Sequence, residues 1–74
     1  MSEYRVHIPI SVTIPVRSTA DNPSSAIEAA IKAVYGIMSI SAQMSLHIDR
    51  EQVKIDELPD GTPICGELWT RHDG

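Results

Sequence analysis

The first part of the chain alternates between apolar and polar side chains over residues 4–17. Every even position is apolar, and every odd position is polar or proline. Successive side chains of a β-strand point to opposite faces of the sheet, so this period of two predicts a strand with one buried and one solvated face. We expect the rest of the fold to be arranged around this strand.

Two prolines limit where this strand can lie in a sheet. Pro9 and Pro15 have the same parity, so their missing N–H donors fall on one side of the strand. The simplest interpretation is an edge strand whose proline-bearing side faces solvent. The alternatives are a bend or bulge near Pro9 that splits the stretch into two short strands, and a strand that protrudes or spans a dimer. A straight strand of this length would reach about 45 Å, which is long for a domain with a radius of gyration of about 11 Å.

An amphipathic helix is predicted next. Asn22, or Asp21, suits the N-cap position and Pro23 suits the first helical position. We expect a helix over residues 23–36 that ends at Gly36, with a short extension to Met38 as the alternative. Its apolar face has helical spacing and consists of Ile27, Ala30, Ile31, Val34 and Met38.

The pattern after the helix predicts a serine-rich connection and then further strands. Residues 39–43 form the connection, and alternation over residues 44–48 predicts a short strand; a second helix over residues 39–51 is the competing interpretation. The phase then changes, so we expect a turn at residues 49–52 or a bulge that resets the register. A strand over residues 53–58 follows.

A tight turn is predicted at Leu58-Pro59-Asp60-Gly61-Thr62, where proline and glycine occupy positions typical of a type I turn. This turn predicts a hairpin that joins residues 53–58 to a final strand over residues 63–70. Gly66 interrupts that strand and indicates a bulge or a close backbone approach.

The order strand, helix and then two or three strands predicts one small α+β domain over residues 1–74. One helix would pack on one face of a three- or four-stranded mixed sheet, and the other face would be polar and exposed. A chain of this length buries only about 60% of its unfolded surface. Its single cysteine, Cys65, allows no internal disulfide, so oligomerisation or docking on a partner is the expected support.

Charge and composition narrow the classes of partner. The formal net charge of −4 weighs against non-specific binding to nucleic acid and favours a partner with a basic surface. No apolar run is long enough to span a membrane, so we expect no membrane partner. The start of the chain lacks a signal sequence and the thiol is solitary, from which we expect a cytoplasmic protein.

The sequence offers few groups for catalysis or cofactor binding. His7 and His47 could share the exposed face of the sheet beside Asp49, but no two ligands have a spacing typical of zinc sites. Cys65 lies in no nucleophile motif, and the glycines form no phosphate-binding pattern. We therefore expect no enzyme, no cofactor and no bound metal.

Two surfaces are candidates for binding. The first is an acidic protein interface that also includes the single tryptophan, although that side chain could instead close the core. The second is the polar face of the first strand, which could bind nucleic acid. The acidic set is Asp49, Glu51, Asp56, Glu57 and Trp69, and the polar strand set is Arg5, His7, Thr13 and Arg17.

These observations predict a small non-enzymatic protein-interaction module, such as an adaptor, a subunit or an inhibitor that acts by surface complementarity. Its partner would be another protein with a basic surface, or a second copy of the chain in a homodimer. One specific form is an acidic inhibitor of a nucleic-acid-processing machine, such as a phage-encoded anti-defence protein. The alternatives are a nucleic-acid-binding module and a small metal-dependent protein that uses His7 and His47.

Overall fold

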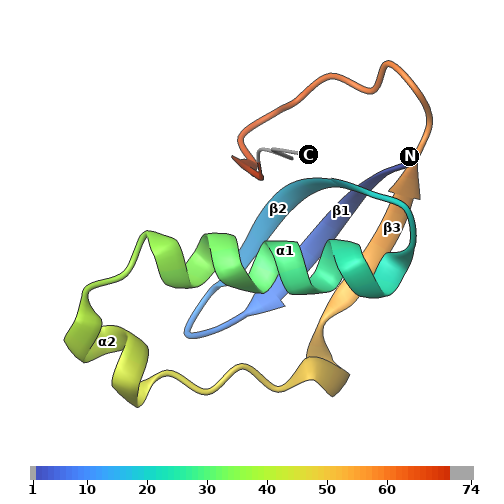
Figure 1. Cartoon of the computed structure of the whole chain (residues 1–74). Helices are drawn as coiled ribbons and strands as arrows, with labels where there is room; N and C mark the ends of the chain where they lie inside the picture. The colour runs from blue at the N-terminus through green and yellow to red at the C-terminus, as the bar shows by residue number, and fades with distance from the viewer. Residues whose placement is uncertain (1, 71–74) are drawn as a thin grey trace.

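The computed structural model describes residues 2–70 and confirms the α+β class (Figure 1). A four-stranded mixed sheet, in the order β3-β1-β2-β4, carries one main helix on one face. The strands are β1 (Ser2–Pro9), β2 (Thr13–Ala20), β3 (Lys54–Leu58) and β4 (Leu68–Trp69), and the helices are α1 (Pro23–Gly36), α2 (Ile40–Ser45) and the 3-10 helix η1 (Arg50–Gln52).

The long alternating stretch is two strands rather than one. β1 and β2 pair antiparallel as a hairpin whose tip is residues 10–12. β1 also pairs with β3 on its other side, so it is an inner strand and the prediction of an edge strand was wrong. Ile8 lies opposite Ile14, and every other pair likewise joins two even or two odd positions. The period of two therefore passes through the tip unbroken, which hides the hairpin in the sequence.

Both prolines pair within the β1–β2 hairpin, and the side that lacks an N–H faces away from it, where no further strand pairs. The carbonyl of Arg17 accepts from the backbone N–H of Thr70, so the odd residues of β2 present their backbone groups to the β4 side. β4 extends along only two residues of β2, which leaves Pro15 beyond its end. Pro9 is likewise beyond His7, the last residue of β1 that pairs with β3. Neither proline interrupts a ladder.

The hydrophobic core lies between the sheet and α1. The helix begins as predicted: the Asn22 side chain accepts from the backbone N–H of Ser25, and Pro23 is in the first turn. It ends at Gly36, so the predicted bounds are confirmed. Small alanine side chains on its buried face let the helix lie close to the sheet. The buried apolar residues are Tyr4, Val6, Ile8, Val16, Ala20, Ala26, Ala30, Ile31, Val34 and Ile48.

The strand predicted over residues 44–48 is wrong. Residues 40–45 form α2, whose N-cap Ser39 accepts from the backbone N–H of Ala42, and residues 46–49 have no regular structure. The phase change that follows is a turn, as we expected, because η1 occupies residues 50–52.

Gln43 joins this helix to the end of α1. Its side-chain amide donates to the carbonyls of Tyr35 and Met38, at 2.8 and 3.0 Å. Tyr35 lies in the last turn of α1, and Met38 follows just beyond its end. Gln43 therefore closes the end of α1 and holds α2 beside it.

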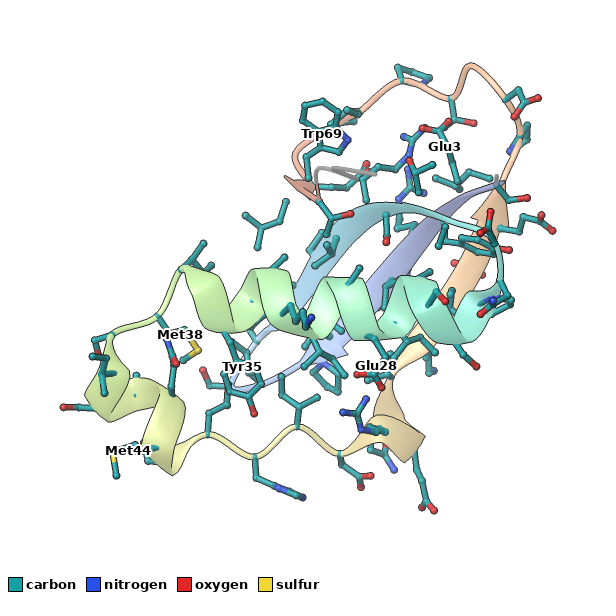
Figure 2. All side chains as sticks on the ribbon, viewed as in Figure 1. Glu3, Glu28, Tyr35, Met38, Met44 and Trp69 are labelled. Carbon is teal, nitrogen blue, oxygen red and sulfur yellow. The ribbon has the colours of Figure 1, made fainter. Side chains whose placement is uncertain are left out.

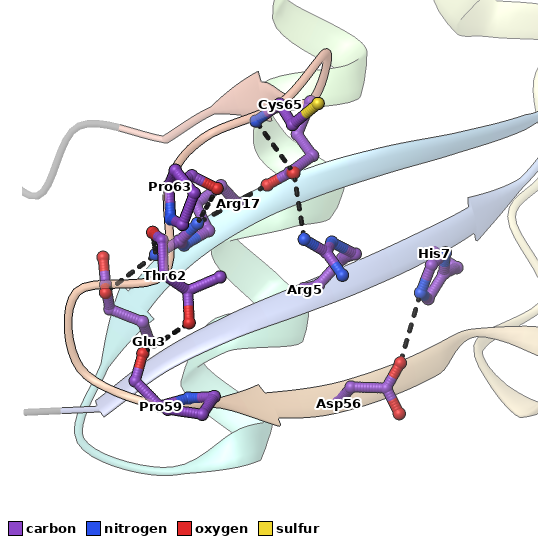
Figure 3. Close-up of polar contacts among 10 residues, drawn as sticks. Glu3, Arg5, His7, Arg17, Asp56, Pro59, Thr62, Pro63 and Cys65 are labelled. Atoms are coloured by element: carbon purple, nitrogen blue, oxygen red, sulfur yellow. Dashed lines mark hydrogen bonds and ion pairs between the residues drawn. The ribbon is translucent and has the colours of Figure 1, made fainter.

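β3 and β4 do not form the predicted hairpin, because they occupy opposite edges of the sheet. The turn itself forms: Thr62 donates to the carbonyl of Pro59, and Gly61 has a φ of 84°. The chain then crosses the face of the sheet opposite α1 along residues 59–67, which we call the crossing segment (Figures 1 and 3). Gly66 has a φ of 74° but no close neighbour, so its role is the turn into β4 rather than a close approach.

Ile8 and Ile64 allow a matched test of the core. Ile8 is fully buried, whereas Ile64 is 50% exposed on the crossing segment. We expect Ile8→Val to lower the free energy of unfolding by about 0.5–1.5 kcal/mol, because it removes a buried methyl group. Ile64→Val should change it by less than about 0.5 kcal/mol. Urea unfolding followed by circular dichroism measures both, and equal losses would contradict this core.

Candidate interaction surfaces

Arg17 lies beneath the crossing segment, on the face of the sheet opposite α1 (Figure 3). Its side chain is only 1% exposed. One guanidinium nitrogen, Nη2, donates to Oε2 of Glu3 at 2.8 Å and to the carbonyl of Thr62 at 2.6 Å, and Nη1 donates to the carbonyl of Pro63 at 3.3 Å. A buried guanidinium is costly unless its N–H groups are bonded. Arg17 therefore holds the crossing segment on the sheet.

Glu67 completes this network from the crossing segment. Its side chain is 2% exposed, and Oε1 accepts from Nη2 of Arg5 at 3.1 Å and from the backbone N–H of Cys65 at 3.2 Å. Its other oxygen lies 3.8 Å from Nη1 of Arg17. Arg5 and Arg17 are cross-strand neighbours that would repel each other without this carboxylate. We call Glu3, Arg5, Arg17 and Glu67 the arginine cluster.

The predicted nucleic-acid face is largely occupied by the protein itself. Both of its arginines bind carboxylates, and Arg17 is buried. His7 and Thr13 lie on the part of this face that the crossing segment leaves open, beside Lys54 and Asp56 in a shallow hollow. Nε2 of His7 is 3.4 Å from Oδ2 of Asp56. The open part of the face therefore has one lysine and a histidine that already contacts an acid.

The two histidines of the predicted metal site lie on different elements. His7 is on β1, whereas His47 is in the irregular segment between α2 and η1, outside the sheet. Over residues 2–70, no group of three or more His, Cys, Asp or Glu side chains is arranged to hold a metal ion.

The predicted acidic interface is divided between separate elements. Asp56 and Glu57 lie on β3 at one edge of the sheet, whereas Trp69 lies on β4 at the opposite edge. Asp49 caps η1 by accepting from the backbone N–H of Glu51, so that carboxylate has a local structural role. Trp69 is 57% exposed and does not close the core.

A different surface appears where α1 ends. Ile37, Ile40 and Met44 are 61%, 77% and 85% exposed, and Val12 at the hairpin tip is 66% exposed. Ile40 and Met44 are four residues apart, so they share one face of α2. Figure 1 shows the hairpin tip, the end of α1 and α2 at the same end of the molecule, and Figure 2 shows Met44 pointing away from it. We call these four residues the apolar end.

The apolar end is also free of charge. Residues 8–16 and 33–46 contain no Asp, Glu, Lys, Arg or His, so the net charge of −4 belongs to the rest of the chain. The sequence alone did not point to this surface. The two uncharged stretches can be seen in the sequence, but it is the folded hairpin and α2 that place them at the same end of the molecule.

No known protein family, curated protein or solved structure matches the chain. Within residues 2–70, no helix is both long enough and apolar enough to cross a membrane. The surfaces described above are therefore the basis for a functional inference.

Breaking the arginine cluster should destabilise the fold strongly. We expect Arg17→Met to lower the free energy of unfolding by about 3–5 kcal/mol, because it leaves the buried Glu67 without one of its cations. The control is Arg50→Met: Arg50 and its partner Glu28 are 57% and 58% exposed, so the loss should stay below about 1 kcal/mol.

A double variant separates the ion pair from simple loss of packing. Arg17→Met combined with Glu67→Met should lower the free energy of unfolding by less than the sum of the two single substitutions, because the contact between these two charges is then lost once rather than twice. Urea unfolding of the wild-type chain, Arg17→Met, Glu67→Met and the double variant measures these differences. Strictly additive losses would show that the two side chains do not interact.

Proposed function

We propose that the protein is a non-enzymatic protein-interaction module that docks onto another protein surface through its apolar end. The observation that supports this proposal is the gathering of four large apolar side chains, each more than 60% exposed, on uncharged stretches of chain. Single exposed apolar residues are ordinary, but a group of them marks an interaction site. Removing such a surface from water contributes about 25 cal/mol for each Å² of apolar area, and the entropy lost on association offsets part of this gain.

The apolar end has a defined shape before any partner binds. Ser39 caps α2, and Gln43 ties α2 to the carbonyls of Tyr35, in the last turn of α1, and Met38, just beyond it. Neither residue uses the face that carries Ile40 and Met44, so that face stays open. A surface that is already ordered loses less conformational entropy on binding, which favours association.

The rest of the surface suits an adaptor, subunit or inhibitor. Glu51, Asp56 and Glu57 are exposed on η1 and β3, where they could meet a basic surface of a further protein. The anti-defence form of this proposal would use these carboxylates. A nucleic-acid-binding role has less support, because Arg5 and Arg17 already bind Glu67 and Glu3.

Placing negative charge on the apolar end should abolish binding and leave the fold intact. In a pull-down from lysate of the native cells, we expect the tagged wild-type chain to capture a partner protein and the tagged Ile40→Glu/Met44→Glu variant not to capture it. The reason is that docking of the variant would bury unpaired carboxylates. Both positions are highly exposed, so each substitution should change stability by less than about 0.5 kcal/mol. Mass spectrometry of the retained proteins and circular dichroism of each variant are the measurements.

The matched control carries the same added charge elsewhere. Ser24→Glu/Gln52→Glu alters exposed positions on α1 and η1, and it should retain the same partner as the wild-type chain. If the two double variants behave alike, the apolar end is not the docking surface.

A further inference from the structure

We infer that the partner at the apolar end is a second copy of this chain, so that the protein works as a two-fold symmetric homodimer. This inference rests on the proposed function, since it names the partner for the same surface. It has three supports: the distribution of charge, the condition of α2 and the polar rim around the apolar residues.

The distribution of charge favours a contact between identical surfaces. Each copy carries a net charge of −4, so two copies repel each other wherever their acidic surfaces meet. The apolar end has no charge to repel its own image. A two-fold contact places the same patch of each copy face to face, which suits a neutral and apolar surface. A basic or an acidic partner would find no complementary charge there.

The short length and the exposure of α2 indicate that a partner packs against it. This helix has six residues, and none of them is buried. Helices shorter than about 12 residues are marginal in water unless tertiary packing supports them. In the isolated chain, support comes from the two ends, through Ser39 and Gln43. A second α2 packed across the face of Ile40 and Met44 would supply the missing packing, and methionine adapts well to such a contact.

The surroundings of the apolar residues fit an interface between proteins. Ser39, Ser41 and Ser45 are exposed beside them and give an uncharged polar rim. Half-buried Ile10 and Met38 extend the apolar surface towards the core. A stable interface takes about 800 Å² from each partner, which is about one sixth of the 4957 Å² of accessible surface.

A lipid surface fits this end less well. Helices that bind at a membrane interface carry lysine and arginine beside their apolar face, because these residues meet anionic headgroups. Residues 8–16 and 33–46 contain neither. An apolar surface with no cation near it is better matched by another apolar protein surface.

Measurement of the mass in solution tests this inference. Light scattering after size exclusion should give twice the 8.1 kDa of one chain. Ile40→Glu/Met44→Glu and Ile40→Lys/Met44→Lys should each weaken self-association by about a hundredfold or more, because the contact would bury like charges. Ser24→Glu/Gln52→Glu is the charge-matched control and should remain dimeric. A wild-type chain that stays monomeric, or a dimer that survives both substitutions at the apolar end, would overturn the inference.

Mixing the two oppositely charged variants tests the two-fold contact directly. The glutamate variant and the lysine variant should associate with each other more tightly than either does with itself, because opposite charges then face each other. A mixture that stays monomeric would contradict a contact in which Ile40 and Met44 meet their own counterparts.

The outcomes also separate this inference from the proposed function. If the wild-type chain is monomeric but Ile40→Glu/Met44→Glu loses a different protein, the homodimer is wrong and the interaction module stands. If the wild-type chain is dimeric and the same variant is monomeric, both hold. If the variant changes neither mass nor partner, both are wrong.

Discussion

The parity of the β1–β2 hairpin is the constraint on which the rest of the structure depends. Since even residues always lie opposite even residues, the large apolar side chains of β1 and β2 face α1, whereas Arg5, His7 and Arg17 face away. The first face packs against the alanine-rich side of α1 and forms the hydrophobic core with it. The second face places Arg5 opposite Arg17 at an inner position of the sheet, where two cations need carboxylates and carbonyls close by.

The crossing segment meets that need and completes the sheet at the same time. The carbonyls of Thr62 and Pro63 accept hydrogen bonds from the buried guanidinium, and Glu67 places a carboxylate oxygen 3.8 Å from it. The carbonyl of Arg17 accepts from both the backbone and the side chain of Thr70. One residue therefore positions both the crossing segment and β4. The arginines that could have contacted phosphates are used inside the protein instead.

The class of fold and the bounds of α1 could be predicted because their signals are local: an N-cap, a proline and a helical period. A split of the long stretch into two strands was only one of the alternatives, because the hairpin tip preserves the alternation of the strands. A helix near α2 was only the competing interpretation, because the alternation over residues 44–48 favoured a strand. The contacts of Gln43 with the carbonyls of Tyr35 and Met38 are tertiary and leave no mark on periodicity. The sequence identified the individual residues of the acidic interface but not their positions relative to one another. Asp56 and Glu57 lie on β3 and Trp69 lies on β4, at opposite edges of the sheet.

The apolar end is a consequence of how apolar and charged residues are separated in this fold. The buried apolar residues lie mainly on one face of the sheet, and the paired charges lie on the other. No residue of α2 is buried, and Ile40 and Met44 therefore contribute nothing to the core. In an isolated copy they expose apolar surface in a domain whose stability margin is already thin. A partner that binds only the folded chain adds stability by mass action. Folding and association would then depend on one another, which gives these exposed side chains a physical role that the monomer alone does not.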